Sequence, residues 1–334
     1  MIYIIPTLKA DRRKISMKSG KIRKKGLGTA RQAEETLETY SREWLEWKRP
    51  RIKEASYAKY RTVIRKHILP QLGGLRPAAL GRETLERFAL SLTEEKKLSP
   101  KTARDILTVL AAILDFGSQR RGGGTGPKID MPRLPRKEMR VLSLREQRLF
   151  MDYLTREMDE CRFAVALALL TGMRIGEICA LRWENISIEE GTVRVCATVQ
   201  RVAAEGGTKL LLGSPKSEAS QRTIPLSDRA LGLCRAMCPG DGRAFVLTGT
   251  ERCMEPRTLQ YRMKKYTEDC GLYGVHFHTL RHTFATRCVE SGFELKSLSE
   301  VLGHSSTSIT LNRYVHSSME MKRSNMKKLA AVGL

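Results

Sequence analysis

Six residues in the second half of the chain combine side-chain types that suit a reaction at an anionic group. They are Arg174, Lys216, His278, Arg281, His304 and Tyr314. Arginine holds a permanent charge on a planar fork that can contact two oxygens of an oxyanion at once. The residue types therefore indicate an anion-binding site that contains a tyrosine hydroxyl.

The first arginine lies where one helix ends and the next begins. An apolar helix is predicted to end at Gly172, so that Arg174 begins the next helix and Glu177 follows one turn later. A surface ion pair is the ordinary explanation of this spacing. The flanking glycines and apolar neighbours favour a less exposed pair. Lys216 lies in a loop before a predicted strand, where a flexible ammonium can reach a ligand, although a loop lysine usually has no function.

A histidine and the second arginine lie together at the start of another predicted helix. His278 and Arg281 are three residues apart and are expected to point the same way, whereas His282 is expected to lie on a different face as a structural residue. The positive end of the helix dipole suits a bound anion. The spacing differs from the helical H-x-x-x-H zinc pattern, so no metal site is predicted.

The tyrosine follows a glycine-terminated helix near the end of the chain. Gly303 is predicted to cap that helix, His304 to lie in the turn, and Tyr314 to come about one short helix later. A single tyrosine in such a place is most often half-buried packing. Its chemical interpretation depends on the combination with the other segments.

In order and approximate spacing, these motifs resemble those of the tyrosine recombinases, a family that includes phage and conjugative-transposon integrases and Xer-type recombinases. The resemblance covers residues 141–334. It implies a mainly α fold with a small antiparallel β-sheet. In this family a helical SAM-like core-binding domain precedes the tyrosine-recombinase catalytic domain.

The resemblance also implies a reaction, transesterification at a DNA phosphodiester. Tyr314 would be the nucleophile that forms a 3′-phosphotyrosyl bond, and a phenol is a tolerable attacker and leaving group because its pKa is near 10. Arg174 and Arg281 would clamp the nonbridging oxygens. Lys216 would protonate the departing 5′-oxygen.

The remaining roles concern two histidines and a carboxylate. By resemblance, His278 would accept the phenolic proton or position the phosphate, and His304 would donate a hydrogen bond to a phosphate oxygen. Glu177 would orient its neighbours. Neither a cofactor nor a metal is implied.

Composition divides the chain into four segments. A basic N-terminal arm spans residues 1–28, and a helical core-binding (DNA-binding) domain spans 29–121. A glycine- and proline-rich linker at 122–140 precedes the catalytic domain with its C-terminal tail helix, 141–334.

Hydrophobic spacing predicts the elements within these segments. In the helical domain it predicts four short helices, of which the second is stopped by Pro70 and the pair Gly73 and Gly74. The catalytic domain begins with a capping box of Ser143 and Glu146. Alternation predicts a strand at 193–199 with partner strands at 186–188 and 221–225, and a long loop at 202–219.

The net charge indicates the partner. The 334 residues include 60 Lys and Arg against 36 Asp and Glu, a net charge of +24 that suits nucleic acid better than any other polyanion. An anionic membrane surface is the second candidate, but no signal peptide or spanning segment is predicted. The 8 cysteines form no CxxC pair, which is typical of thiols in a reducing cytoplasm. We therefore expect a cytoplasmic protein without a membrane partner.

The expected function is site-specific recombination by a homotetramer on paired sites in double-stranded DNA. Integration and excision of a mobile element is the expected role, with an accessory excision factor or a host DNA-bending factor as a further partner. A type IB topoisomerase shares this chemistry and is the first alternative. A non-catalytic DNA-binding relative is the second.

Overall fold

The computed structural model describes residues 35–120, 122, 124–135, 139–204, 206–215, 220–238 and 242–314. Contacts divide the described residues into two compact units, one containing those up to 50 and 63–132, the other containing 51–62 and those from 133 onward. The division after residue 132 falls within the predicted linker, and the finer domain bounds remain a prediction. The predicted arm and the tail helix after Tyr314 lie outside the described residues.

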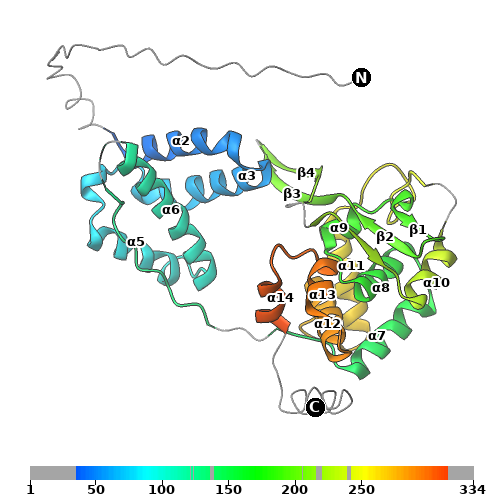
Figure 1. Ribbon diagram of the computed structural model, residues 1–334. Coiled ribbons are helices and arrows are strands. Elements are labelled where there is room, and N and C mark those ends of the chain that lie inside the picture. Colours follow the sequence, from blue (N-terminus) through cyan, green and yellow to red (C-terminus); the bar gives the residue numbers. More distant parts are fainter. Residues whose placement is uncertain are drawn as a thin grey trace, which may run out of the picture. The chain divides into compact units, whose positions relative to one another are not determined.

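The described part of the N-terminal half, from residue 35 to 120, is helical (Figure 1). Its elements are α2 (Leu37–Lys48), the 3-10 turn η1 (Arg49–Arg51), α3 (Glu54–Val63), the π-helix η2 (Ile64–Ile68), α4 (Leu69–Leu72), the 3-10 turn η3 (Pro77–Ala79), α5 (Arg82–Glu94) and α6 (Pro100–Arg120). Most of α3 belongs to the second unit. Within the first unit α6 packs against α2, α5 and η2, and Trp44, Phe88 and Leu110 are buried in its core.

The predicted helix stop at Pro70 is wrong, because helical structure continues through the proline to Leu72. A proline has no N–H for the carbonyl four residues back, and its ring crowds that carbonyl. Here the wider π turn at 64–68 directly precedes it, and Pro70 lies in the first turn of α4, where a missing donor costs little.

The C-terminal half contains the small sheet and the remaining helices (Figure 1). The helices are α7 (Leu144–Arg156), α8 (Glu160–Thr171), α9 (Ile175–Cys179), the 3-10 turn η4 (Trp183–Asn185), α10 (Asp228–Met237), α11 (Pro256–Asp269), α12 (Phe277–Glu290), α13 (Leu295–Leu302) and α14 (Thr307–Tyr314). The strands β1 (Ile186–Ser187), β2 (Thr192–Val195) and β5 (Arg222–Pro225) form an antiparallel sheet in the order β1-β2-β5. The mainly α fold with a small antiparallel sheet is therefore confirmed.

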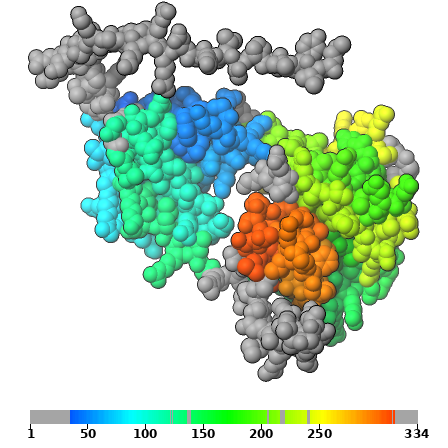
Figure 2. Space-filling view, in the orientation of Figure 1, coloured from blue at the N-terminus to red at the C-terminus, as the bar shows by residue number. Residues whose placement is uncertain are grey.

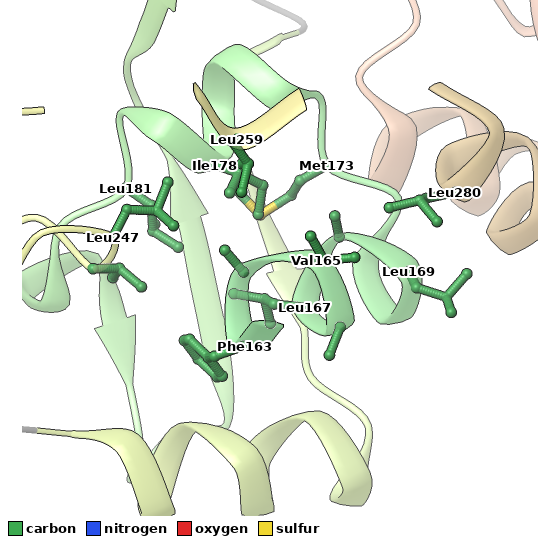
Figure 3. Close-up of a cluster of buried hydrophobic side chains, with 14 of the residues drawn as sticks. Phe163, Val165, Leu167, Leu169, Met173, Ile178, Leu181, Leu247, Leu259 and Leu280 are labelled. Carbon is green, nitrogen blue, oxygen red and sulfur yellow. The ribbon is translucent and has the colours of Figure 1, made fainter. Parts of the chain in front are cut away.

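Helix α8 is the centre of the second unit's core. Its apolar residues face neighbours on every side, as expected of a helix that is hydrophobic all round. Figure 3 shows Phe163, Val165 and Leu167 of α8 among side chains that include Leu247 and Leu259. Within the described ranges no helix has the length and apolar character needed to cross a bilayer.

The predicted loop at 202–219 is largely wrong, because residues 198–213 form a hairpin. Strand β3 (Thr198–Ala204) pairs antiparallel with β4 (Gly207–Gly213), and the strand predicted at 193–199 is split between β2 and β3. Most side chains of β4 are exposed, so its sequence lacks the alternation that reveals a half-buried strand. Strand β4 is therefore held in place by its pairing with β3 and not by burial of its side chains.

Candidate active site

The site begins at the junction of α8 and α9. Gly172 ends α8 in the left-handed conformation, with φ at 67°, and Arg174 follows as the N-cap of α9. The Arg174 backbone N–H donates to Glu177 Oε2 at 2.9 Å, and its Nη1 donates to Oε1 at 2.7 Å. Glu177 is only 3% exposed, so this pair is not the surface ion pair that its spacing alone favours.

A second arginine, absent from the predicted set, holds the same carboxylate. Arg222 donates from its two terminal nitrogens to Glu177 at 3.2 and 3.0 Å, and from Nε to the Val301 carbonyl at 2.5 Å. Burial alone would raise the pKa of Glu177, but Arg222 and Arg174 outweigh it and lower the pKa. Period-two alternation could have revealed Arg222, because it shares the strand face of buried Ile224.

Substitution of this arginine should be costly. Arg222→Met is expected to lower the free energy of unfolding by roughly 3–5 kcal/mol, because it leaves a buried carboxylate with one of its two cations. Lys264→Met, which removes an exposed pair with Glu268, should cost no more than about 1 kcal/mol. Urea denaturation followed by circular dichroism measures both.

The pH dependence of that loss supplies a control. The pKa of Glu177 is lowered in the folded state, so its contribution is present above the unfolded value of about 4.3. This contribution is lost as the pH falls through the pKa of Glu177 in the folded protein. The difference in the free energy of unfolding between Arg222→Met and the unmodified protein should therefore become smaller at that pH. Equal losses for the Arg222 and Lys264 variants at neutral pH would contradict the buried pair.

Arg281, the other arginine of the predicted set, lies on α12 and contacts the C-terminal ends of α8 and α13. It is 1% exposed and donates from Nη1 to the Gly172 carbonyl at 2.9 Å and from Nη2 to the Leu302 carbonyl at 2.6 Å. Arg174 Nη2 lies 3.3 Å from the next carbonyl, that of Gly303. The carbonyls at the ends of α8 and α13 thus accept hydrogen bonds from the guanidiniums of Arg281 and Arg174, and they hold the two guanidiniums close together.

Helices α8 and α13 both end at a glycine in the left-handed conformation, which a residue with a side chain rarely adopts. Gly303 has a φ of 64°, and Gly172 adds a close approach, since a Cβ there would lie 2.6 Å from a ring carbon of Phe284. These glycines therefore fix the carbonyls that orient the arginines.

The histidines and the tyrosine lie beside these arginines, on α12, on α14 and in the turn between α13 and α14, a region that is orange to red in Figure 2. His304 Nδ1 is 2.8 Å from Thr310 Oγ1, and its ring is nearly parallel to that of Tyr314, at a centroid distance of 6.4 Å. Tyr314 is 6% exposed. The structure thus brings His304 and Tyr314 together.

The prediction that His282 lies on a different face from His278 is wrong. The two rings meet edge to face at 4.5 Å, as expected for residues four apart on a helix. His282 Nδ1 lies 2.9 Å from the Tyr314 hydroxyl. The predicted Lys216 lies outside the described residues, so its place in the site is untested.

The electrostatics of this cluster favour an anion. Burial, and then Arg174, lower the pKa of Arg281 to about 9, so the guanidinium still carries its charge at neutral pH. Burial, and then Arg281, lower the pKa of His304 to about 3, and burial followed by His278 lowers the pKa of His282 to about 4. The imidazoles are therefore neutral hydrogen-bonding groups beside permanent cations.

The tyrosine is protonated when the site is empty. Burial raises the pKa of Tyr314, and Arg281 and Arg313 only partly oppose this effect. A phenol in this state becomes a good nucleophile only when a neighbouring group takes its proton.

Comparison with known proteins shows the family of the chain. The family model described as "Phage integrase family" matches residues 140–321, and "Phage integrase, N-terminal SAM-like domain" matches 36–79. A XerC-like tyrosine recombinase of Caldanaerobacter subterraneus subsp. tengcongensis is 27% identical over 296 residues, 79% of this chain and 74% of that protein. Tyrosine recombinase XerC of Pseudomonas aeruginosa is 28% identical over 240 residues, 70% of this chain and 74% of that protein.

Solved structures share the fold. The Tn1549 transposon integrase in complex with circular intermediate DNA has a TM-score of 0.72 at 21% identity, covering 88% of this chain and 99% of that one. The lambda integrase tetramer bound to a Holliday junction has a TM-score of 0.62 at 20% identity, covering 87% and 84%. The family model matches more than half of the sequence, and the chain therefore belongs to the phage integrase family, the tyrosine recombinases.

Proposed function

We propose that the chain is a site-specific DNA recombinase that cuts and rejoins duplex DNA through a covalent bond to Tyr314. The observation that carries the proposal is the buried hydroxyl of Tyr314, which lies within electrostatic reach of Arg281 and Arg313. A nucleophile placed beside permanent cations suits attack on a phosphodiester, whose transition state concentrates negative charge on oxygen.

The guanidiniums bind that charge. Arg281 uses one N–H of each terminal nitrogen on a carbonyl, which leaves three of its five donors for the nonbridging oxygens. Arg174 lies beside it, fixed by Glu177. His304 is held through Nδ1, so its Nε2 remains to donate to a phosphate oxygen.

The reaction exchanges one phosphodiester for another. The Tyr314 oxygen bonds to phosphorus, the bond from phosphorus to the 5′-oxygen breaks, and a 3′-phosphotyrosyl intermediate and a free 5′-hydroxyl result. We assign protonation of the 5′-oxygen to Lys216 and positioning of the phosphate to His278. Because a diester is conserved, a second 5′-hydroxyl can reverse the step and rejoin the strand without an external energy source.

The proposed partner is double-stranded DNA, which the net charge of +24 supports. Related integrases were solved with DNA, one of them as a tetramer on a Holliday junction, and this supports four protomers acting on paired sites. The transposon origin of the Tn1549 integrase supports a role in moving a mobile element. An accessory excision factor or a host DNA-bending factor completes the proposed assembly.

The test can begin without a known DNA site. The protein is incubated with a pool of randomised, nicked duplexes, detergent-resistant protein–DNA adducts are captured, and the enriched sequence is rebuilt as a defined duplex. Two such duplexes with different labels should then exchange strands and give recombinant products. Relaxation of supercoiled DNA without any exchange would indicate a topoisomerase, and sequence-specific binding without an adduct would indicate a non-catalytic relative.

A further inference from the structure

The contact between His282 and Tyr314 is a buried hydrogen bond between a ring nitrogen and the hydroxyl of the proposed nucleophile. His282 lies on α12 and is 9% exposed, and Tyr314 is the last residue of α14 and is 6% exposed. The distance from His282 Nδ1 to Tyr314 Oη is 2.9 Å, which is within the hydrogen-bonding distance required between a general base and the hydroxyl that it deprotonates.

His278 is the proton acceptor that the family resemblance implies. It lies one turn before His282, near the start of α12. Its ring contacts His282 edge to face, and the residue is more exposed to solvent than His282, although burial is also the main cause that lowers its pKa to about 4. The order of the three groups is therefore the Tyr314 phenol, the His282 imidazole that contacts it, and the His278 imidazole behind that ring. We propose that His282, and not His278, accepts the Tyr314 proton during strand cleavage; this inference rests on the proposed function.

The step balances as a proton transfer coupled to transesterification. As the Tyr314 oxygen bonds to phosphorus, its proton moves to His282 Nδ1, while the 5′-oxygen departs and takes a proton from the general acid. In rejoining, a 5′-hydroxyl attacks phosphorus and gives its proton back to the general acid, while the tyrosine oxygen leaves phosphorus and takes the proton held by His282. No oxidant, metal or cofactor enters the balance.

The surrounding charges make this base depend on the substrate. Burial is the largest cause that lowers the pKa of His282 to about 4, followed by the groups that face it, which are His278 and Arg281 on its own helix and Arg313 on α14. A phosphodiester between the arginines would offset the part of this shift that their positive charge causes. The imidazole is therefore expected to be a stronger base with DNA bound than in the free protein.

The kinetic test compares His282→Asn with His278→Asn on the duplex recovered by adduct capture. Asparagine places an oxygen near the Nδ1 position, so it keeps a hydrogen-bond acceptor but is not basic. Single-turnover adduct formation is measured from about pH 4 to 9, so that the range reaches the pKa of about 4 of His282, with duplex binding and thermal unfolding as folding controls. The rate of the unmodified protein should fall as acid protonates His282, and His282→Asn should be about 10²–10⁴-fold slower without that acid limb. His278→Asn should keep the limb.

Three outcomes would overturn the assignment. A His282→Asn variant with a normal rate would show that its basicity is not needed, and a faster one would show that the bond restrains the tyrosine. Loss of the acid limb in His278→Asn would return the role to His278. If the unmodified protein forms no adduct at all, the proposed function fails first, so the two failures are distinguishable.

A second measurement needs no DNA and no folded His282 variant. Nitrogen NMR of the histidine-labelled protein identifies which ring nitrogen of each neutral imidazole carries a proton. The proposal requires an unprotonated Nδ1 on one histidine whose resonance shifts in Tyr314→Phe. A protonated Nδ1 would mean that the phenol accepts the bond, and His282 could not then take its proton.

Discussion

Tyr314→Phe is expected to bind the selected duplex as tightly as the unmodified protein and to form no covalent adduct. Only the hydroxyl is lost, and the ring that packs beside His304 remains. The change leaves His282 Nδ1 without its partner in a buried place, which costs about 1–3 kcal/mol of stability. Binding and adduct formation are therefore compared well below the unfolding temperature.

The control is a tyrosine outside the site. Tyr261 is 73% exposed, and Tyr261→Phe should form the adduct at the normal rate. Tyr266 is a poor alternative nucleophile, because burial raises its pKa to about 12. Adduct formation that persists in Tyr314→Phe and disappears in Tyr261→Phe would mean that the nucleophile is assigned to the wrong residue.

Arg281→Lys is expected to slow adduct formation by about 10²–10³-fold although the charge is conserved. The arginine is 1% exposed and holds two carbonyls while it keeps further donors for the phosphate. A lysine ammonium has three donors and no fork, so it must choose between the carbonyls and the phosphate oxygens. Arg174→Lys should show the same kind of loss, because the Arg174 guanidinium also donates to Glu177 and to the Gly303 carbonyl while it keeps donors for the phosphate.

A matched control lies on the same helix. Arg287 of α12 donates to the Leu142 carbonyl and to Gln147, away from the proposed nucleophile. Arg287→Lys should leave the rate of adduct formation nearly unchanged, even if it lowers stability. A near-normal rate for Arg281→Lys, measured at saturating duplex, would place that arginine outside the transition state.

Local signals predicted much of this structure because they depend on neighbouring residues. The capping box of Ser143 and Glu146 is present, since both of its bonds join atoms three residues apart. The apolar run of α8 predicted a buried helix, and the glycine after it ends that helix. The motif residues in the described part of the chain were proposed from order and spacing alone, and their roles stay predictions.

The failures involve contacts between distant segments. Strand β4 has exposed side chains and is held by pairing to β3, which no single-strand pattern reveals. Arg222 meets Glu177 from 45 residues away, and alternation, which places Arg222 on the face of buried Ile224, gives no sign of that partner. The contact between His282 and Tyr314 joins α12 to α14, and motif spacing alone gives no distance between them.

The site of the covalent bond is the most direct evidence for or against a tyrosine nucleophile at position 314. The adduct formed by the unmodified protein is digested with nuclease and trypsin, and the modified peptide is sequenced by mass spectrometry. Trypsin cuts after Arg313, so Tyr314 begins its own peptide. We expect a nucleotide joined through its 3′-phosphate to the Tyr314 oxygen. A nucleotide on any other residue, or one attached through its 5′-phosphate, would contradict the proposed reaction.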